Sequence, residues 1–542
     1  MAETFDFIII GAGPNGLAIG AYLSRAGQKV LLLEKRLEEG GGLMTEQVTL
    51  PDFYHNTHAL YMMMVDMAPV YSDFDFETTW DVHHVFPDLQ VALPTRDDRC
   101  LCFYRDVDKT CQSIAQFSES DARAYRTMHA RYDEMMTKIL GPQTYVPMDP
   151  APVMAAKAEQ TALGRELSEL AEKTPQEIVC EMYEHDVVRT AMLYMGTHWG
   201  LDYSQSGVSY MVPIYLNRMV NYQITCGGSH RVSNALYKSI FAHQGQIRQS
   251  ARIERIVVER SEAKGVRLED GREYVAAKAV ISTLNPHQTF LDYVGREHLE
   301  QDFVAMIESY MWEKWSLNNL HLALNEPPHF KAAEQIPDVD SALLYVLGFE
   351  RMQELTDYYD AIIAGDLPER FGLTCTFPSV HDRYQAPAGK ATAYLSQMAP
   401  YALRDGGRDR WYRRDFRAAR AEQMIELLSR YTTNTDASRI LKTYMTTPVD
   451  IENKYATMVQ GGYKHGAYHP LQMGYLRPNQ DCSQYRTPIK NLYVGGASVA
   501  PGGMIIWGPG YNCANAVAED YGIEKWWRQP EMVRSAVEHG YI

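Results

Sequence analysis

Residues 5–34 read FDFIIIGAGPNGLAIGAYLSRAGQKVLLLE, and this stretch decides the fold. The apolar run 5–10 predicts a short buried strand, and residues 30–33 predict a second one. Residues 17–26 between them favour a helix, because apolar side chains recur along one face. A strand, a helix and a second strand in this order predict a βαβ unit. The chain is therefore expected to be an α/β protein with a Rossmann-like sheet.

The turn after the first strand has the spacing Gly11-x-Gly13-x-x-Gly16, and Glu34 follows the second strand. The first glycine permits a tight turn, the second lets the backbone approach a pyrophosphate, and the third lets the helix pack against the sheet. The helix N-terminus stabilises the phosphate charge. We expect Glu34 to accept hydrogen bonds from a ribose diol, and its charge disfavours a 2′-phosphate. The pattern predicts binding of FAD or NAD rather than NADP.

A second glycine cluster, residues 40–42, lies shortly after Glu34. It resembles the second glycine motif of the GG-doublet flavoproteins, a group that includes amine oxidases and phytoene desaturases. NAD dehydrogenases have no such element, so the resemblance favours FAD. Members of the group commonly carry an Arg after the doublet, and Gly42 stands at that place here.

Two further blocks resemble the same group of proteins. Residues 226–232, followed by the strand-like run 247–256, are similar to the middle segment of the group. The resemblance implies that Ile253 holds the adenine through its backbone. Residues 491–498, followed by residues 501–506, are similar to the last FAD segment of the phytoene desaturases. The resemblance also implies a helix soon afterwards, whose N-terminus points at the flavin.

On these motifs the chain is identified as a member of the phytoene desaturase superfamily of GG-doublet FAD-dependent oxidoreductases. The branch is the one that resembles pyridine nucleotide-disulfide oxidoreductase domain proteins. The resemblance is strong over residues 1–60, 222–290 and 455–520. The chain departs from it beside the expected flavin. The usual His-Pro-Gly-Gly-Gly is Ala-Pro-Gly-Gly-Met at residues 500–504, and Trp507 stands where a small residue is expected.

The resemblance implies a discontinuous Rossmann-like FAD-binding domain with an inserted substrate domain of mixed helix and sheet. The expected FAD-binding parts are 1–105, 222–290 and 455–525, the substrate parts are 106–221 and 291–454, and 526–542 is a C-terminal tail. No Cys or His stands at a recognisable attachment motif, so the FAD is expected to be noncovalent. The expected cofactor-binding residues are Gly11, Gly13, Pro14, Asn15, Gly16, Glu34, Lys35, Gly41, Gly42, Leu43, Ile253, Gly496, Ala497, Met504 and Ile505.

Composition excludes several other classes of protein. The chain has 542 residues, with 52 Lys and Arg against 68 Asp and Glu, and a net charge of −16 that disfavours nucleic-acid binding. No apolar run is long enough to span a bilayer, and the N-terminus lacks the basic region of a cleaved signal. The 8 cysteines form no Cys-x-x-Cys, so we expect free thiols and no metal site. Cytoplasmic localisation is expected, and peripheral membrane contact and homo-oligomerisation remain open.

The expected function is FAD-dependent dehydrogenation, or desaturation, of a largely apolar substrate, with flavin N5 taking the hydride. Oxygen or a quinone is the expected electron acceptor. Three alternatives remain open. One is an α,β-desaturase or oxidase acting on a cyclic ketone or acid, and another is a redox-neutral isomerase that moves a double bond. The third is a flavin-binding scaffold without turnover.

Four residues are candidates for the chemistry. His55 and His58 follow the second glycine motif, where the chain of the resembled family passes the flavin face; the alternative is a pair of ordinary histidines at a sheet edge. The register places Trp507 and Tyr511 near the flavin, where both are expected to line the cavity, and Tyr511 is also a candidate proton acceptor. Trp507 and Met504 are expected to narrow the cavity, so that a small substrate fits and a long polyene does not.

Overall fold

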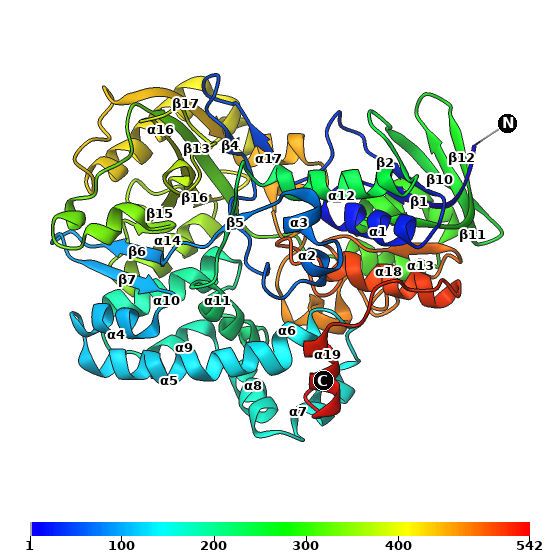
Figure 1. Cartoon of the computed structure of the whole chain (residues 1–542), viewed down its shortest axis with the longest axis horizontal. Coiled ribbons are helices and arrows are strands. Elements are labelled where there is room, and N and C mark those ends of the chain that lie inside the picture. Colours follow the sequence, from blue (N-terminus) through cyan, green and yellow to red (C-terminus); the bar gives the residue numbers. More distant parts are fainter. Residues whose placement is uncertain (1–2) are drawn as a thin grey trace.

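The computed structural model describes residues 3–542, and it has two seven-stranded sheets with helices around them (Figure 1). The first, which we call the nucleotide sheet, has the order β10-β11-β12-β1-β2-β9, and β18 also pairs with β12. Its strands are β1 (Glu3–Ile10), β2 (Val30–Leu33), β9 (Gln246–Arg248), β10 (Ile253–Glu259), β11 (Glu262–Leu268), β12 (Glu273–Ser282) and β18 (Leu492–Val494).

The nucleotide sheet is parallel at its centre, as the βαβ pattern predicts. β1 pairs in parallel with both β2 and β12, while β10, β11 and β12 form an antiparallel meander. Helix α1 (Pro14–Arg25) packs against α12 (His230–Ala242) and α18 (Gly508–Asp520). Segments from the beginning, middle and end of the chain therefore form one layered unit.

The second sheet, which we call the substrate sheet, has the order β17-β13-β16-β15-β14-β6-β7. Its strands are β6 (Leu89–Pro94), β7 (Cys100–Tyr104), β13 (Ser316–Leu324), β14 (Leu344–Leu347), β15 (Leu373–Thr376), β16 (Ala391–Ala399) and β17 (Ile440–Thr446). The expected boundary at residue 105 is therefore wrong, because residues 89–104 pair with β14 and not with the nucleotide sheet.

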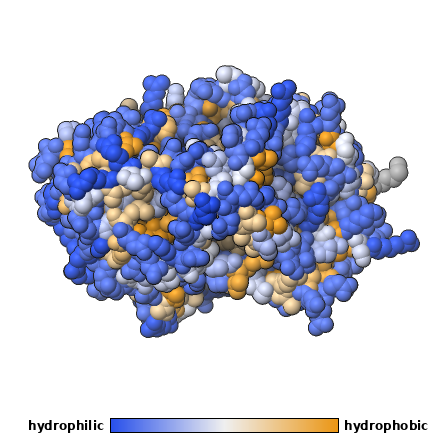
Figure 2. All heavy atoms as spheres, turned by 90° about the horizontal axis from the view of Figure 1, so that it is seen from below, coloured by the Kyte–Doolittle hydropathy of each residue, from blue (hydrophilic) through white to orange (hydrophobic). Residues whose placement is uncertain are grey.

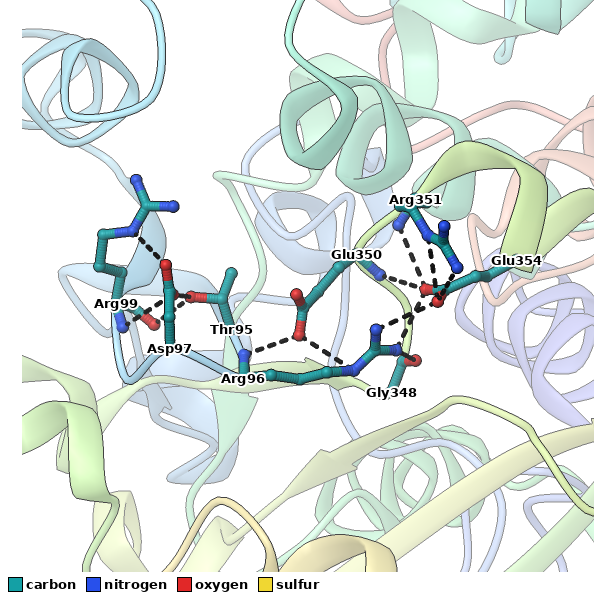
Figure 3. A network of polar contacts seen from close by, with 8 residues as sticks. All are labelled: Thr95, Arg96, Asp97, Arg99, Gly348, Glu350, Arg351 and Glu354. Atoms are coloured by element: carbon teal, nitrogen blue, oxygen red, sulfur yellow. Dashed lines mark hydrogen bonds and ion pairs between the residues drawn. The ribbon is translucent and has the colours of Figure 1, made fainter.

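An ion-pair network fixes the hairpin of β6 and β7 to the rest of the substrate sheet (Figure 3). The guanidinium of Arg96, in the hairpin turn, donates to both carboxylate oxygens of Glu354 at 3.1 Å and to the carbonyl oxygen of Gly348 at 3.1 Å. The backbone N–H of Arg96 donates to Glu350 at 2.7 Å. These contacts join residues far apart in the sequence and tie the hairpin turn to residues 348–354.

Helices cover the substrate sheet and continue below it (Figure 1). The predicted helical region after residue 106 contains α4 (Val107–Ala115), α5 (Glu119–Met135), α6 (Gly141–Gln143), α7 (Ala151–Ala158), α8 (Ala162–Glu172), α9 (Pro175–Met182), α10 (Asp186–His198) and α11 (Val212–Arg218). The later helices are α13 (Gln301–Glu308), α14 (Met352–Ile363), α15 (Pro378–His381), α16 (Arg414–Ser429) and α17 (Pro448–Lys454). The C-terminal α19 (Glu531–Glu538) packs against α6.

Short elements complete the fold. Helices α2 (Pro69–Asp73) and α3 (Phe76–Trp80) follow two-residue strands, and the two small sheets pair β3 (Thr45–Glu46) with β4 (His55–Asn56) and β5 (His84–Val85) with β8 (Ile224–Thr225). The underside of the molecule is mostly hydrophilic, with apolar side chains in small groups (Figure 2). Within residues 3–542 no helix has the length and apolarity needed to cross a membrane.

Candidate active site

A trough runs along the carboxyl ends of β1 and β2, where open α/β sheets bind their ligands. We call it the nucleotide trough; it has a volume of about 250 Å³. The glycine turn, Glu34, Lys35 and Arg36 line one side, and Ala251–Ile253 line another. The buried nitrogen Nη1 of Arg36 has no hydrogen-bond partner among the described residues. An unpaired cationic nitrogen in a trough with a glycine turn fits an anionic dinucleotide.

The three glycines of the turn have the separate roles that the spacing predicts. Gly11 has φ of +94°, a conformation that favours glycine. A Cβ on Gly16 would overlap the carbonyl oxygen of Gly11, so the helix packs on the strand only with glycine there. A Cβ on Gly13 would meet no atom within 4 Å, so the space beside Gly13 is open to a pyrophosphate. The residues present therefore fit FAD.

Glu34 lies at the end of β2 and is almost fully buried. Its Oε2 accepts a hydrogen bond from the backbone N–H of Ala12 at 2.9 Å, and its Oε1 accepts one from the backbone N–H of Arg36 at 3.0 Å. Each carboxylate oxygen can accept a second hydrogen bond, so the ribose role stays compatible with these contacts. The carboxylate also holds the glycine turn against β2, which the sequence did not indicate.

The second glycine cluster packs against a histidine of a neighbouring cavity. Gly41 has φ of +54°, and a Cβ on it would lie 3.1 Å from Cα of Gly13. A Cβ on Gly42 would lie 2.8 Å from Cδ2 of His58. The His58 ring therefore occupies the space that a side chain at position 42 would need. This packing gives a physical reason for glycine at the place where the resembled family carries Arg.

The segment before α18, near the C-terminal end of the chain, completes the site. Oδ1 of Asn15 accepts a hydrogen bond from the backbone N–H of Gly510 in the first turn of α18. The approach to this helix contains Met504, Ile505 and Trp507, which have φ of +68°, +56° and +65°. Non-glycine residues rarely adopt this conformation, and such strain persists where surrounding contacts impose it. The helix predicted after residue 506 is thus present, and it begins at Gly508.

A second cavity, which we call the substrate cavity, opens beside the trough and has a volume of about 140 Å³. Its walls come from the second glycine motif, α10, four strands of the substrate sheet, and the segments 458–465 and 497–506. Within residues 3–542 no Asp, Glu, Lys or Arg lines it. Its aromatic and histidine lining consists of His58, Tyr61, His198, Trp199, Tyr394, Tyr463 and His465.

The histidines of the substrate cavity are held neutral. Burial, with smaller effects from the neighbouring His465 and Lys454, lowers the pKa of His58 to about 3. Burial also lowers the pKa of His198 to about 3 and that of His465 to about 4. At neutral pH the cavity wall therefore carries no net charge, and each imidazole keeps a free lone pair that can accept a proton.

The cofactor-binding predictions fall into three places. Gly11, Gly13, Pro14, Asn15, Glu34, Lys35, Gly41, Gly42, Ile253 and Ala497 line the nucleotide trough. Met504 and Ile505 line the substrate cavity. Gly16, Leu43 and Gly496 line neither and act in packing: a Cβ on Gly496 would overlap the carbonyl oxygen of Thr283. Ile253 lies at the start of β10 and lines the trough, and its contact with the adenine stays a prediction.

Three of the four catalytic candidates lie outside the substrate cavity. His55 is buried on β4, where Nε2 contacts Oγ1 of Thr49 at 2.7 Å. Trp507 has no exposed surface and packs edge-on against Tyr71. Tyr511 points into the core between Tyr22 and Tyr145.

The expectation that Trp507 and Tyr511 line the cavity is therefore wrong. The side chains of both residues are buried in the core instead. His58 alone of the four lines the cavity. Sequence reasoning missed His465, Tyr463 and Tyr394, which belong to no motif, and only their place in the fold reveals them.

Comparison with known proteins agrees with this geometry. A model of flavin-containing amine oxidoreductases matches residues 156–508, and a model of NAD(P)-binding Rossmann-like domains matches residues 9–75. The chain belongs to the flavin-containing amine oxidoreductase family. It is thus an FAD-dependent dehydrogenase with the predicted α/β fold, and FAD as the cofactor is confirmed, while noncovalent attachment stays a prediction.

Relatives within this family extend over the whole chain. One of the subunits of limonene dehydrogenase from Castellaniella defragrans is 36% identical over 99% of this chain and 98% of its own. A phytoene desaturase (lycopene-forming) from Pseudescherichia vulneris is 24% identical over 92% of this chain and 95% of its own. The structure of cyclohexylamine oxidase from Brevibacterium oxydans has a TM-score of 0.59 at 16% identity, covering 96% of this chain and 99% of its own. This last likeness shows the fold alone.

Proposed function

We propose that the chain dehydrogenates a small, neutral, cyclic hydrocarbon of monoterpene size. The observation that carries the proposal is the substrate cavity without a charged side chain among the described residues. An ammonium or carboxylate substrate would lose its hydration there without gaining an ionic partner, at a cost of several kcal/mol. A hydrocarbon has no charged group to dehydrate, so it enters this cavity without that cost.

The size of the cavity also supports a single small ring. A cavity of about 150 Å³ holds benzene in other proteins, and this one measures about 140 Å³. Tyr61, Trp199, Tyr394 and Tyr463 supply aromatic walls, so the small volume does not depend on Trp507. The relative that is 36% identical is named as part of a limonene dehydrogenase, and this name agrees with the substrate class.

The chain's residues would divide the chemistry as follows. FAD, when bound, accepts a hydride from a substrate carbon. The trough holds the dinucleotide through the glycine turn and Glu34, and the cavity orients the ring and excludes water. Removal of a second hydrogen as a proton needs a base. The neutral, buried imidazoles that line the cavity are the candidates for this base.

Anaerobic mixing of the FAD-loaded protein with limonene tests the proposal. We expect loss of the flavin absorbance near the visible maximum and a product two mass units lighter. Cyclohexylamine, a cyclic ketone and a forty-carbon polyene serve as matched competitors. Faster bleaching with the amine or the ketone than with the hydrocarbon would reject the substrate class. A product of unchanged mass without bleaching would support the isomerase, and no change with any compound would support the scaffold.

We further propose that oxygen or a quinone reoxidises the flavin, and that any membrane contact is peripheral. Mixing the reduced protein with air-saturated buffer or with a soluble quinone separates the two acceptors. Sedimentation with lipid vesicles tests membrane contact, and light scattering tests whether the chain forms a homo-oligomer.

A further inference from the structure

His465 lies where the two cavities meet. Six residues line both the nucleotide trough and the substrate cavity: Pro14, Asn15, Gly42, Met458, His465 and Ala497. His465 is the titratable member of this set. His465 therefore lies between the two cavities, whereas His58 and His198 line the substrate cavity alone.

The backbone at His465 is strained, with φ of +57°. Hydrogen bonds on both sides impose this conformation. Glu313 accepts from the backbone N–H of Lys464 at 2.6 Å and from that of Gly466 at 3.0 Å. The carbonyl oxygen of His465 accepts from Oη of Tyr310 at 2.8 Å and from Oγ of Ser498 at 3.0 Å. A strained residue held by so many contacts is typical of a functional site.

A buried arginine joins this loop to the cofactor segment. Arg477 has no exposed surface, and its Nη2 donates to the carbonyl oxygens of Lys464 at 2.9 Å and of Ala497 at 3.2 Å. Both carbonyls flank the point where the two cavities meet. The loop 463–467 is thus fixed from one side by Glu313 and from the other by Arg477.

Of the two charged side chains nearest in effect to His465, a carboxylate favours a proton there and a guanidinium opposes it. The carboxylate of Glu313 raises the pKa of His465, while burial and Arg477 lower it, burial most strongly. The amine of Lys464 points away, over the rings of Tyr463 and Trp315. Glu313 is the carboxylate that raises the pKa of His465, and it holds the backbone on both sides of that residue.

His58 lacks such support. Burial lowers the pKa of His58 most, and His465 and Lys454 lower it as well; Lys454 is itself paired with Glu46. An imidazolium at position 58 would therefore form beside other basic groups. Between the two histidines near the cofactor, His465 is the one whose charged form has a carboxylate beside it.

We propose that His465 accepts the proton that leaves the substrate, and that Glu313 is its positioning residue; this rests on the dehydrogenation proposed above. One C–H bond gives its hydride to FAD, and the adjacent C–H bond gives its proton to a ring nitrogen of His465. The electron pair of the second bond forms the new double bond. Atoms and charge balance, because the substrate loses one hydride and one proton.

Rapid anaerobic mixing of His465→Ala with substrate tests this assignment. The compound used is whichever of the four panel compounds reduces wild-type flavin fastest, so that a wrong substrate class and a wrong base give separate results. We expect the rate of flavin reduction to fall about 10²- to 10⁴-fold. FAD content and the substrate dissociation constant, from equilibrium dialysis, should stay within about threefold. Added imidazole should restore part of the rate.

His58→Ala is the matched control, since it removes an imidazole from the same cavity. Its rate should not respond to imidazole. Rescue of His58→Ala instead of His465→Ala, or a loss below tenfold in His465→Ala, would overturn the proposal. In Glu313→Gln the acid limb of the rate profile should move to lower pH, because the charge that raises the pKa of His465 is gone. An unmoved limb with full FAD content would reject the role of Glu313.

Discussion

Asn15 and Gly510 are 495 residues apart in the chain, and Oδ1 of Asn15 accepts a hydrogen bond from the backbone N–H of Gly510 at 3.1 Å. The first N–H groups of a helix have no partner within it, so this contact satisfies one of them in α18. It also holds the N-terminus of α1 against that of α18. Both helix ends thereby converge on the place where the two cavities meet.

Asn15→Ala should lower the free energy of unfolding by about 0.5–1.5 kcal/mol and weaken FAD binding, because the N–H of Gly510 loses its partner. Asn15→Asp is the matched control. It keeps an acceptor beside a helix N-terminus, so stability without FAD should be retained, while its charge repels the pyrophosphate. Melting temperatures with and without FAD measure both effects. Equal FAD affinity in all three proteins would contradict this reasoning.

Gly13→Ala and Gly16→Ala should fail in different ways. A methyl group at position 13 enters open space, so the FAD-free protein should melt near the wild-type temperature and still lose its FAD. A methyl group at position 16 overlaps the carbonyl oxygen of Gly11, so that variant should lose stability even without cofactor. Thermal melting and the ratio of flavin to protein absorbance distinguish the two. A yellow, stable Gly13→Ala would refute the role of Gly13.

Glu34→Ala should weaken FAD binding about 10- to 150-fold, equivalent to about 1.5–3 kcal/mol, through loss of charge-assisted hydrogen bonds. Activity should return with excess FAD, because Glu34 does not line the substrate cavity. Glu34→Gln keeps an oxygen acceptor, so its FAD affinity should lie between those of the wild type and Glu34→Ala. Titration of the FAD-free protein measures the affinities. Activity that stays lost at saturating FAD would contradict the assignment.

Trp507→Ala should lower the free energy of unfolding by about 3–5 kcal/mol without changing substrate preference. The reason is that the buried ring packs against Tyr71 and lies outside the substrate cavity. Met504→Ala is the matched control; it should change the relative rates with small and large rings, since Met504 lines the cavity. Urea unfolding and competition between two substrates provide the measurements. Altered selectivity in Trp507→Ala would show that Trp507 does line the cavity.

His321→Leu should make the protein less sensitive to acid. His321 has no exposed surface, neither ring nitrogen has a partner, and burial holds its pKa well below the usual value. Below about pH 6.5 the unfolded chain protonates this ring and the folded chain does not, so stability falls as pH falls. The advantage of His321→Leu over the wild type should therefore grow by about 2 kcal/mol between pH 8 and pH 5.

Urea unfolding at the two pH values measures this difference. The same change at His539, an exposed histidine in the chain's last turn, is the control. An advantage of His321→Leu that does not vary with pH would show that the buried imidazole is not the source of acid sensitivity.

The nucleotide site could be predicted because its residues form local sequence motifs. The substrate site could not, because it depends on contacts between residues far apart in the sequence. The glycine turn and Glu34 act within one βαβ unit, so their spacing alone identifies them. His465 reaches the site through a loop held by Glu313, a residue far away in the sequence, and no spacing rule connects them. Trp507 was misplaced because register locates a Cα and not the direction of its side chain. The β6–β7 hairpin was misassigned because its partner β14 lies roughly 250 residues later.

The nucleotide sheet has a consequence for the synthesis of this protein. β18, which pairs with β12, and α18, which packs on α1, come from the last part of the chain. At about 5–20 residues per second, roughly 25–100 s pass between the synthesis of β1 and that of β18. During this interval the apolar strands that have already left the ribosome are not yet covered by β18 and α18. An N-terminal fragment should therefore aggregate, and slower growth at low temperature or extra chaperone should raise the yield of the full chain.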